Sequence, residues 1–213
     1  MTKVTSFTFN PFQENTYIIY DDSKECIIID PGCYEVEEKA EMIDFIQRNQ
    51  LKPVRLLNTH CHIDHVFGNK FIADTYDLDL EIPEGELIVL NAVPQIAKMY
   101  GIPYPEPSPA PGRFIQVGEV VDFGTTSLKC LFTPGHSPAS MSFYCEAARF
   151  LIAGDVLFAG SIGRTDLPGG NLNTLLQSIR NQFFVLPDEV IVYPGHMGST
   201  TIGKEKRSNP FLK

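Results

Sequence analysis

Short apolar or alternating runs and longer amphipathic segments take turns along the first part of the chain. Residues 4–9, 16–20 and 26–29 are rich in β-branched and aromatic side chains, which predicts three strands, and an Asp-Pro-Gly break follows. Residues 36–50 repeat apolar side chains at helical spacing, with charged residues between them, which predicts an amphipathic helix. A short apolar strand is expected at 54–58.

The next part of the chain combines a second predicted helix, at residues 66–76, with a proline-rich excursion at about 81–116. A short helix at about 85–100 precedes a rigid extended loop there. We interpret the excursion either as a lid over a functional site or as a surface connection. Its seven prolines are Pro83, Pro94, Pro103, Pro105, Pro107, Pro109 and Pro111.

The second half returns to short strands and then has a helical pattern at residues 172–183 and a last strand at 189–193. Both halves thus place strands before a helix, a pattern that favours two packed sheets with helices outside them. A length of 213 residues suits one domain, so we expect a single α+β domain over 1–213. The other strands predicted in this half are 119–123, 128–132, 141–145 and 150–153.

The composition argues against several classes of ligand and location. The net charge is −9 and the seven arginines form no cluster, which disfavours nucleic acid as a partner. No run approaches the roughly 18 apolar residues of a membrane helix, and the N-terminus lacks a signal-peptide core. We therefore expect a cytoplasmic protein without membrane contact. The five scattered cysteines fit buried apolar positions better than disulfides.

The stretch LLNTHCHIDHVFGN, residues 56–69, is the most unusual feature of the sequence. It places three imidazoles and a carboxylate within six positions, at His60, His62, Asp64 and His65. Cys61 lies between two of the histidines and could serve as a soft metal ligand. An extended backbone would instead turn its side chain to the opposite side, and we favour that interpretation.

The two remaining histidines, His136 and His196, each follow a strand and a Pro-Gly pair, while Asp155 follows an apolar strand and a glycine. Every histidine of the chain thus lies at a predicted strand end. Five imidazoles and two carboxylates suit two divalent metal ions held about 3.5–4 Å apart. Zinc is our first choice, and iron and manganese accept the same ligands.

The motif THCHIDH resembles the T-H-x-H-x-D-H signature of the metallo-β-lactamase superfamily, and the later PGH, GD and PGH elements follow in that family's order. The resemblance spans nearly the whole chain. It implies a four-layer αββα sandwich, the metallo-β-lactamase fold, with the metal site at one edge between the two sheets. It also implies one metal site of His60, His62 and His136, and a second of Asp64, His65 and His196, with Asp155 bridging the ions.

Further segments indicate the branch of this family. Asp155 stands where dizinc β-lactamases usually carry a cysteine, which disfavours antibiotic hydrolysis. AGSIGRTDLPGGN resembles the GRTD stretch of single-domain glyoxalase II-like (hydroxyacylglutathione hydrolase-like) hydrolases and of persulfide dioxygenases, and the terminal NPFLK resembles the short bacterial hydrolase type. Full glyoxalase II enzymes carry a glutathione-binding helical region where only 17 residues follow His196 here, and Asp166 replaces a tyrosine that grips glutathione. Glutathione recognition is therefore an open question.

The resemblance and the ligand set together predict a metal-dependent hydrolase of S-lactoylglutathione or a related small anionic thioester. Two cations that share a water lower its pKa, so a bridging hydroxide attacks the thioester carbonyl and a metal stabilises the oxyanion. The thiolate, with a pKa of about 8.5, leaves without a strong acid. Asp64 would bind metal and orient the nucleophile or take its proton. We expect a monomer or a small homo-oligomer.

Two other polar residues have two interpretations each. Arg164 is our candidate for binding a substrate carboxylate through charge-assisted pairing, but a salt bridge with Asp166 is an equally good interpretation. Asp30 could orient an imidazole ligand from behind, yet its position before Pro-Gly favours a plain turn residue.

Two alternative functions fit the same residues less well. A persulfide dioxygenase would, by resemblance, hold a single iron with His60, His136 and Asp155, because two histidines and one carboxylate suit non-haem iron. A non-catalytic metal protein is the third hypothesis. Structural zinc sites are usually closed, whereas seven ligands around two ions leave coordination positions open.

Overall fold

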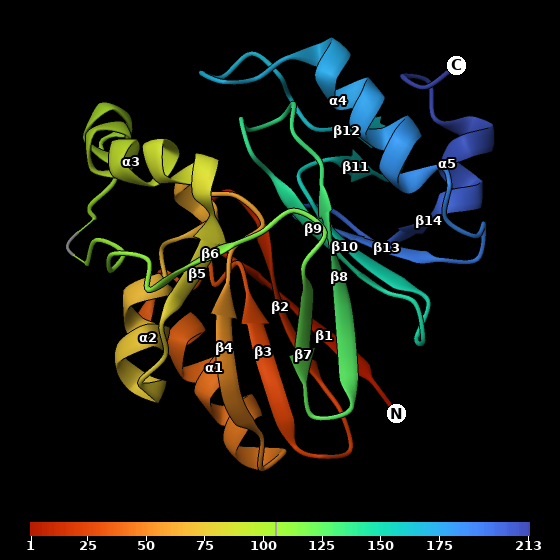
Figure 1. Ribbon diagram of the computed structural model, residues 1–213. Helices are drawn as coiled ribbons and strands as arrows, with labels where there is room; N and C mark the ends of the chain where they lie inside the picture. Colours follow the sequence, from red (N-terminus) through yellow and green to blue (C-terminus); the bar gives the residue numbers. More distant parts are fainter. Residues whose placement is uncertain (105) are drawn as a thin grey trace. The chain divides into compact units, whose positions relative to one another are not determined.

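The computed structural model of the protein describes residues 1–104 and 106–213. The chain forms two compact units. Unit 1 comprises Met1–Ile115 and Asp122–Thr126, and unit 2 comprises Gln116–Val121 and Ser127–Lys213. The described residues form two six-stranded sheets with accompanying helices (Figure 1), so the predicted α+β class with two sheets is confirmed. A single domain over 1–213 stays a prediction.

The first sheet has the strand order β1-β2-β3-β4-β5-β6 and lies in unit 1. β1, β2 and β3 pair in antiparallel fashion, whereas β3 to β6 are parallel. β2 and β3 have isoleucine-rich sequences typical of buried strands. The strands are β1 (Lys3–Phe9), β2 (Glu14–Tyr20), β3 (Glu25–Ile29), β4 (Lys52–Leu57), β5 (Leu80–Pro83) and β6 (Arg113–Ile115).

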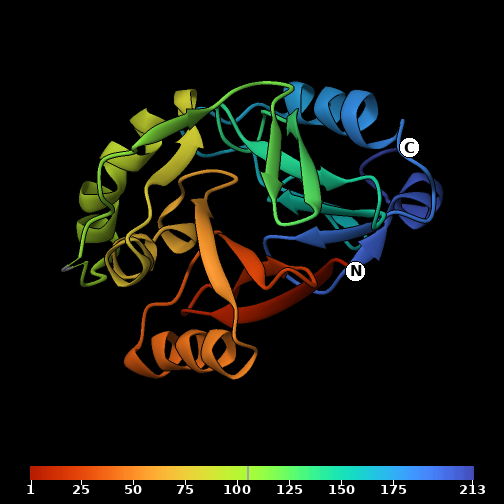
Figure 2. The same ribbon diagram turned by 60° about the horizontal axis from the view of Figure 1, so that its bottom comes forward.

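Helices make the crossovers that the parallel strands of this sheet require. α1 (Val36–Arg48) begins with a capping box and buries Met42 and Ile46 in the core of unit 1, and Figure 2 shows the helix along one face of the sheet. The helix predicted at 36–50 is confirmed, although Val36, expected on its apolar face, is 75% exposed.

The second helix of unit 1 begins later than predicted. α2 (Asn69–Tyr76) follows a turn at residues 66–68, which comes directly after the short 3₁₀ helix η1 (Ile63–His65). Gly68 allows this turn to pack against the segment after β3, because a Cβ on residue 68 would lie 2.4 Å from Cys33 Sγ.

The proline-rich excursion contains more regular structure than expected. The 3₁₀ helix η2 (Glu84–Glu86) and α3 (Leu87–Tyr100) follow β5, and Pro94 lies inside α3. The loop after α3 is attached to unit 1, since Tyr34 Oη donates to the Pro103 carbonyl oxygen over 2.8 Å. These contacts fit a surface connection, while the lid function stays a prediction. Pro105 lies outside the described residues.

The second sheet has the order β14-β13-β10-β9-β8-β7. β8, β9 and β10 are antiparallel neighbours, and β13 is parallel to β10. A two-stranded sheet of β11 and β12 lies beside Asp155 in the sequence. The strands are β7 (Val120–Phe123), β8 (Thr126–Phe132), β9 (Met141–Cys145), β10 (Phe150–Gly154), β11 (Leu157–Phe158), β12 (Ser161–Ile162), β13 (Ile191–Pro194) and β14 (Thr200–Thr201).

The helices of unit 2 pack on an apolar core of their own. α4 (Leu172–Ser178) begins at the N-cap Asn171, whose side chain accepts from the Thr174 amide, and continues as a π-helical turn η3 (Ile179–Phe183). This is the helix predicted at 172–183. α5 (Ile202–Ser208) was not predicted, and its Ile202 lies in the same core as α4.

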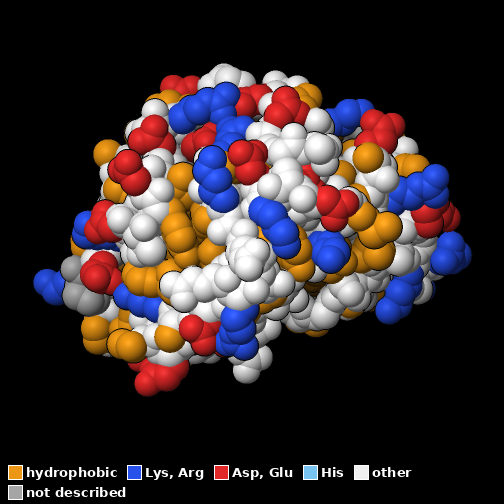
Figure 3. All heavy atoms as spheres, turned by 90° about the horizontal axis from the view of Figure 1, so that it is seen from below, with side chains coloured by type: hydrophobic (Ala, Val, Ile, Leu, Met, Phe, Trp, Pro, Cys, Tyr) orange, Lys and Arg blue, Asp and Glu red, His pale blue; other side chains and the backbone are white. Residues whose placement is uncertain are grey.

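Charged side chains of both signs are interspersed on the face shown in Figure 3. This mixture agrees with the absence of an arginine cluster in the sequence, and the prediction that nucleic acid is not a partner stays a prediction. Among the described residues, the helices are too short or too polar to cross a lipid bilayer.

Candidate functional site

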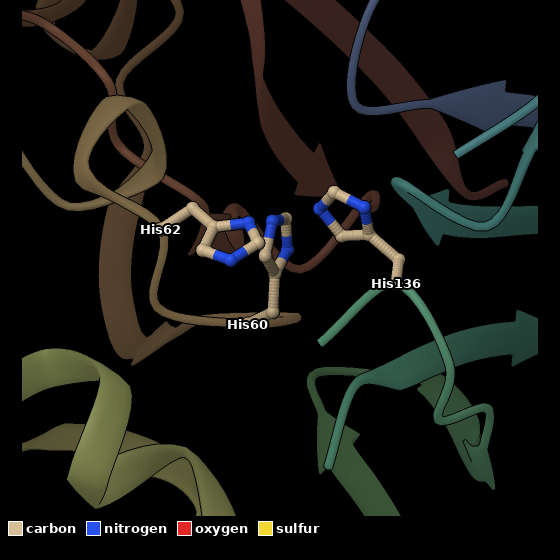
Figure 4. Close-up of side chains that lie close together, drawn as sticks. All are labelled: His60, His62 and His136. Atoms are coloured by element: carbon tan, nitrogen blue, oxygen red, sulfur yellow. The ribbon is translucent and has the colours of Figure 1, made fainter. Parts of the chain in front are cut away.

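Four of the predicted metal ligands lie in unit 1 on the segment that follows β4. β3 and β4 are parallel neighbours, so their carboxyl ends share one sheet edge, where ligands of such sheets usually bind. The rings of His60 and His62 (Figure 4) are 4.8 Å apart and nearly perpendicular. The rings of His60 and His65 are 4.1 Å apart. Nε2 of His65 lies 3.6 Å from Oδ2 of Asp64. Their assignment to two metal sites stays a prediction.

Asp30, the residue after β3, supports two of these imidazoles from behind. Its Oδ2 lies 3.2 Å from Nδ1 of His65 and accepts from Thr59 Oγ1 over 2.6 Å. Because the Thr59 hydroxyl hydrogen is used there, the Thr59 oxygen accepts from Nδ1 of His60 over 3.0 Å. We therefore assign the ring hydrogen of both histidines to Nδ1, the tautomer in which Nε2 could bind a metal.

This geometry corrects the preferred sequence interpretation of Asp30 as a plain turn residue. Its φ of 50° does place it in a turn. Its carboxylate is nevertheless buried and held by the Thr59 amide over 2.7 Å, so that it faces His65. The orienting role that the sequence left as the weaker interpretation is the one the structure confirms.

Two residues from the start of the chain approach the same segment. Asn10 donates through Nδ2 to the carbonyl oxygens of Gly32 and Asp64, both over 3.0 Å, which fixes the backbone at Asp64. Glu14 is fully buried, with Oε1 at 3.8 Å from Nδ1 of His65. Burial raises the pKa of the Glu14 carboxyl well above its ordinary value, and the nearby His65 opposes that shift.

Cys61 packs in the apolar core of unit 1, although it lies between two histidines in the sequence. Burial raises the pKa of its thiol well above the ordinary value, so the thiolate that a metal would bind is disfavoured. The favoured interpretation, a cysteine turned to the opposite side, is confirmed. All five cysteines are buried and free of disulfides, as predicted.

The other three predicted ligands lie together in unit 2. β8, β10 and β13 run in the same direction, so the residues that follow them, His136, Asp155 and His196, start from one edge of the sheet. Oδ2 of Asp155 lies 3.5 Å from Nε2 of His136 and 3.4 Å from Nε2 of His196. One carboxylate oxygen thus faces two imidazole nitrogens, which is the arrangement expected of a shared metal ligand.

Arg164 contacts this set through its backbone. Its carbonyl oxygen accepts from Nδ1 of His136 over 2.8 Å, which places the ring hydrogen of His136 on Nδ1. Its exposed side chain makes a bidentate ion pair with Asp166, over 2.7 and 2.8 Å. The hydrogen bonds from Arg164 lower the pKa of Asp166 to about 2. The salt-bridge interpretation is therefore confirmed, and substrate binding by Arg164 stays a prediction.

A comparison with known families decides what kind of protein carries these two ligand sets. The sequence model described as Metallo-beta-lactamase superfamily matches residues 9–196, which include every predicted ligand. The chain belongs to the metallo-beta-lactamase superfamily. Membership supports an enzyme of the metallo-hydrolase type, and it confirms the resemblance inferred from the motif THCHIDH.

Individual relatives cover almost the whole chain. Hydroxyacylglutathione hydrolase GloC of Haemophilus influenzae is 37% identical over 202 residues, which are 94% of this chain and 93% of that protein. The crystal structure of BLEG-1 B3 metallo-beta-lactamase has a TM-score of 0.90 and 36% identity, covering 99% of this chain and 100% of that one. TTHA1623, solved in a di-iron-bound form, has a TM-score of 0.87 and 34% identity, covering 98% and 100%. The chain thus has the metallo-beta-lactamase fold.

The two ligand sets fit the divalent metals that this superfamily binds. Neutral imidazole nitrogen and carboxylate oxygen are the donors that zinc, iron and manganese share. Donor atoms of Asp30, His60 and His65 lie within 4.8 Å of one another in unit 1, but Asp30 contacts His65 at Nδ1 and belongs to neither predicted ligand set. Oxygen acceptors orient His60, His65 and His136 through Nδ1, as is usual for metal-binding histidines.

The sequence alone suggested Asp30 but did not identify Thr59 and Gly163 as residues that support the predicted ligands. Thr59 belongs to the motif, but its link between His60 and Asp30 depends on the fold. Gly163 lets its backbone lie close to the backbone of Asp155, since a Cβ on residue 163 would lie 1.9 Å from the Asp155 carbonyl oxygen. The only sign of this close approach in the sequence is the glycine directly before Arg164.

Proposed function

We propose that the protein is a dinuclear metallohydrolase that cleaves thioesters of the S-lactoylglutathione type or a related acyl thiol. In this proposal His60, His62 and His136 hold one ion, Asp64, His65 and His196 hold the second, and Asp155 bridges both. The observation that carries the proposal is Asp155 Oδ2 within 3.5 Å of both His136 Nε2 and His196 Nε2. The similarity to hydroxyacylglutathione hydrolase GloC over 94% of the chain supports the thioester substrate.

The bound metals would supply an activated water and stabilise negative charge on the carbonyl oxygen of the substrate. The protein contributes orientation and proton transfer. Asp30, Thr59 and the Arg164 carbonyl hold the histidines through Nδ1. Asp64, whose backbone Asn10 fixes, would orient the attacking water and take its proton.

Two features of the proposed substrate, its thiolate leaving group and its negative charge, agree with the residues of the site. A thiolate with a pKa of about 8.5 departs without a dedicated acid. An anionic substrate carboxylate would compete with Asp166 for the guanidinium of Arg164, which is exposed and already arranged for bidentate pairing. Arg164 is therefore the substrate-binding candidate.

A thioester panel tests the proposal. Metal-free protein is loaded with zinc, iron or manganese and assayed for thiol release from S-lactoylglutathione, an acyl-coenzyme A and a simple acyl thiol. A β-lactam is included because BLEG-1 carries that name. We expect thiol release from at least one thioester, lost in His62→Ala, with zinc the most effective metal. Hydrolysis of the β-lactam alone, or none with any metal, would refute the proposal.

The second candidate is a mononuclear iron persulfide dioxygenase, with the iron held by His60, His136 and Asp155. TTHA1623, 34% identical, was solved in a di-iron-bound form, which supports iron as the metal but not a single ion. One iron per chain together with oxygen uptake on glutathione persulfide would establish this function. Thiol release without oxygen uptake would exclude it.

A further inference from the structure

Glu14, at the start of β2 in unit 1, is a buried carboxyl group that none of the roles above uses. Its side chain is 0% exposed. Oε2 accepts from Thr16 Oγ1 over 3.0 Å, and the Thr16 oxygen in turn accepts from the Gly32 amide over 2.8 Å. Oε1 has no hydrogen-bond partner among the described residues and lies 3.8 Å from Nδ1 of His65.

The space for the Glu14 carboxyl group depends on a glycine, and burial of that group is unfavourable. A Cβ at Gly32 would lie 2.0 Å from Glu14 Oε2, so the space that Glu14 fills exists only because residue 32 is glycine. Burying a carboxyl oxygen without a hydrogen bond is unfavourable. A glutamine could accept from Thr16 equally well, so the hydrogen bond to Thr16 does not explain the carboxyl group. The atom that Oε1 does face is Nδ1 of His65.

Asp30 approaches the same nitrogen of His65, at 3.2 Å. Two carboxyl groups, from the start of β2 and the end of β3, thus lie beside one imidazole nitrogen. We propose that Glu14 is a positioning residue for His65, holding the ring together with Asp30 so that Nε2 is presented beside Asp64. This inference rests on the proposed function only in taking His65 as a metal ligand.

The substitution Glu14→Gln tests this role, because it keeps the shape and the Thr16 contact while removing the carboxyl group. Thr16→Val is the matched control, since it removes both hydrogen bonds of the Thr16 hydroxyl and leaves Glu14 in place. Zinc and cobalt binding to the metal-free protein is measured by competition with a chromophoric chelator, and metal-free stability is measured by thermal unfolding.

We expect the metal titration of Glu14→Gln to show one of the two metal-binding steps weakened by about 10-fold or more and the other little changed. Removal of a group that supports a metal ligand has an effect of this size. The melting temperature of the metal-free protein should not fall. Thr16→Val should affect metal binding less than Glu14→Gln does. Unchanged binding in Glu14→Gln, or equal weakening in both variants with a lowered melting temperature, would overturn the inference in favour of a structural role.

A second readout separates this inference from the proposed function. The ¹⁵N shifts of the His65 ring in the metal-free protein report which nitrogen carries the hydrogen. We expect these shifts to change in Glu14→Gln and to stay near wild type in Thr16→Val. If the wild type binds fewer than two ions, the proposed function fails, and the ring shifts alone decide the role of Glu14: no change in Glu14→Gln refutes it.

Discussion

The carbonyl oxygen of Arg164 accepts a hydrogen bond from Nδ1 of His136 over 2.8 Å. One residue thus makes two separable contacts, because the carbonyl orients the imidazole of a proposed metal ligand and the side chain pairs with Asp166. Substitution of the side chain leaves the backbone group in place. The two contacts can therefore be tested independently.

The Arg164→Ala variant should bind an anionic thioester more weakly but hydrolyse the bound substrate at an unchanged rate. We expect KM to rise about 10-fold or more, because a charge-assisted pair to the substrate is lost, and kcat to change little. Steady-state kinetics with a thioester that carries a carboxylate, and with one that lacks it, measures the effect. Asp166→Ala is the control, and it should not raise KM for the anionic substrate. Equal KM values for Arg164→Ala and wild type would exclude the substrate role.

Asp30→Asn should impair both His60 and His65, since Asp30 reaches one through Thr59 and the other directly. An amide can donate to Nδ1 as well as accept, so the preference for the hydrogen on Nδ1 is lost. We expect metal affinity to fall by about 10- to 100-fold. Chelator competition measures this loss. Wild-type affinity in Asp30→Asn would show that the carboxylate does not support the ligands.

Gly163→Ala should destabilise the protein and weaken metal binding together. The added Cβ would meet the Asp155 carbonyl oxygen at 1.9 Å and His136 Nδ1 at 3.2 Å, so the backbone must move. Overpacking of this kind costs about 1–3 kcal/mol. Gly198→Ala is the matched control, because a Cβ there meets nothing within 4 Å. Urea unfolding and zinc titration of both variants measure the difference, and equal behaviour of the two would contradict this prediction.

Asp21 should make stability depend on pH in the acid range. Burial by itself raises the pKa of Asp21, but the hydrogen bonds from Ser23 and Thr125 outweigh it and hold the pKa far below the ordinary 3.8. A lowered pKa in the folded protein gives stability that is complete above the unfolded-state value and is lost as the pH falls below it. Asp21→Asn should therefore cost about 1–3 kcal/mol at pH 7 and progressively less below pH 3.8.

Urea unfolding between pH 7 and pH 3 measures this effect. The exposed neighbour Asp22 provides the control, and Asp22→Asn should change the free energy of unfolding little. A difference between Asp21→Asn and wild type that does not shrink at low pH would contradict the assignment.

Periodicity predicted the longer elements well because each has its own local signal. α1 and the strands of the second sheet show helical or alternating patterns over several residues. β5, β6 and the two-residue strands were missed, since the proline-rich segment hides the first two and two residues carry too little pattern to recognise. α5 was missed because its seven residues are largely polar.

The predicted ligands were easier to recognise in the sequence than the groups that contact them. His60, His136 and the other predicted ligands stand out because histidine is rare in the chain and occurs at strand ends. Glu14 is 51 positions from His65, and nothing local links the two. The Arg164 carbonyl has no sequence signature at all, because every residue carries one. Asp30 was undervalued, since an aspartate before Pro-Gly suits a turn equally well.

The most direct test of the central claim is X-ray absorption spectroscopy on protein loaded with zinc to saturation. The claim is that the seven proposed ligands hold a pair of metal ions that shares Asp155. It predicts a metal–metal scattering distance of about 3.5–4 Å with imidazole ligands. That feature should disappear in Asp155→Ala. A spectrum of isolated ions in the wild type, with no neighbouring metal, would contradict the dinuclear centre.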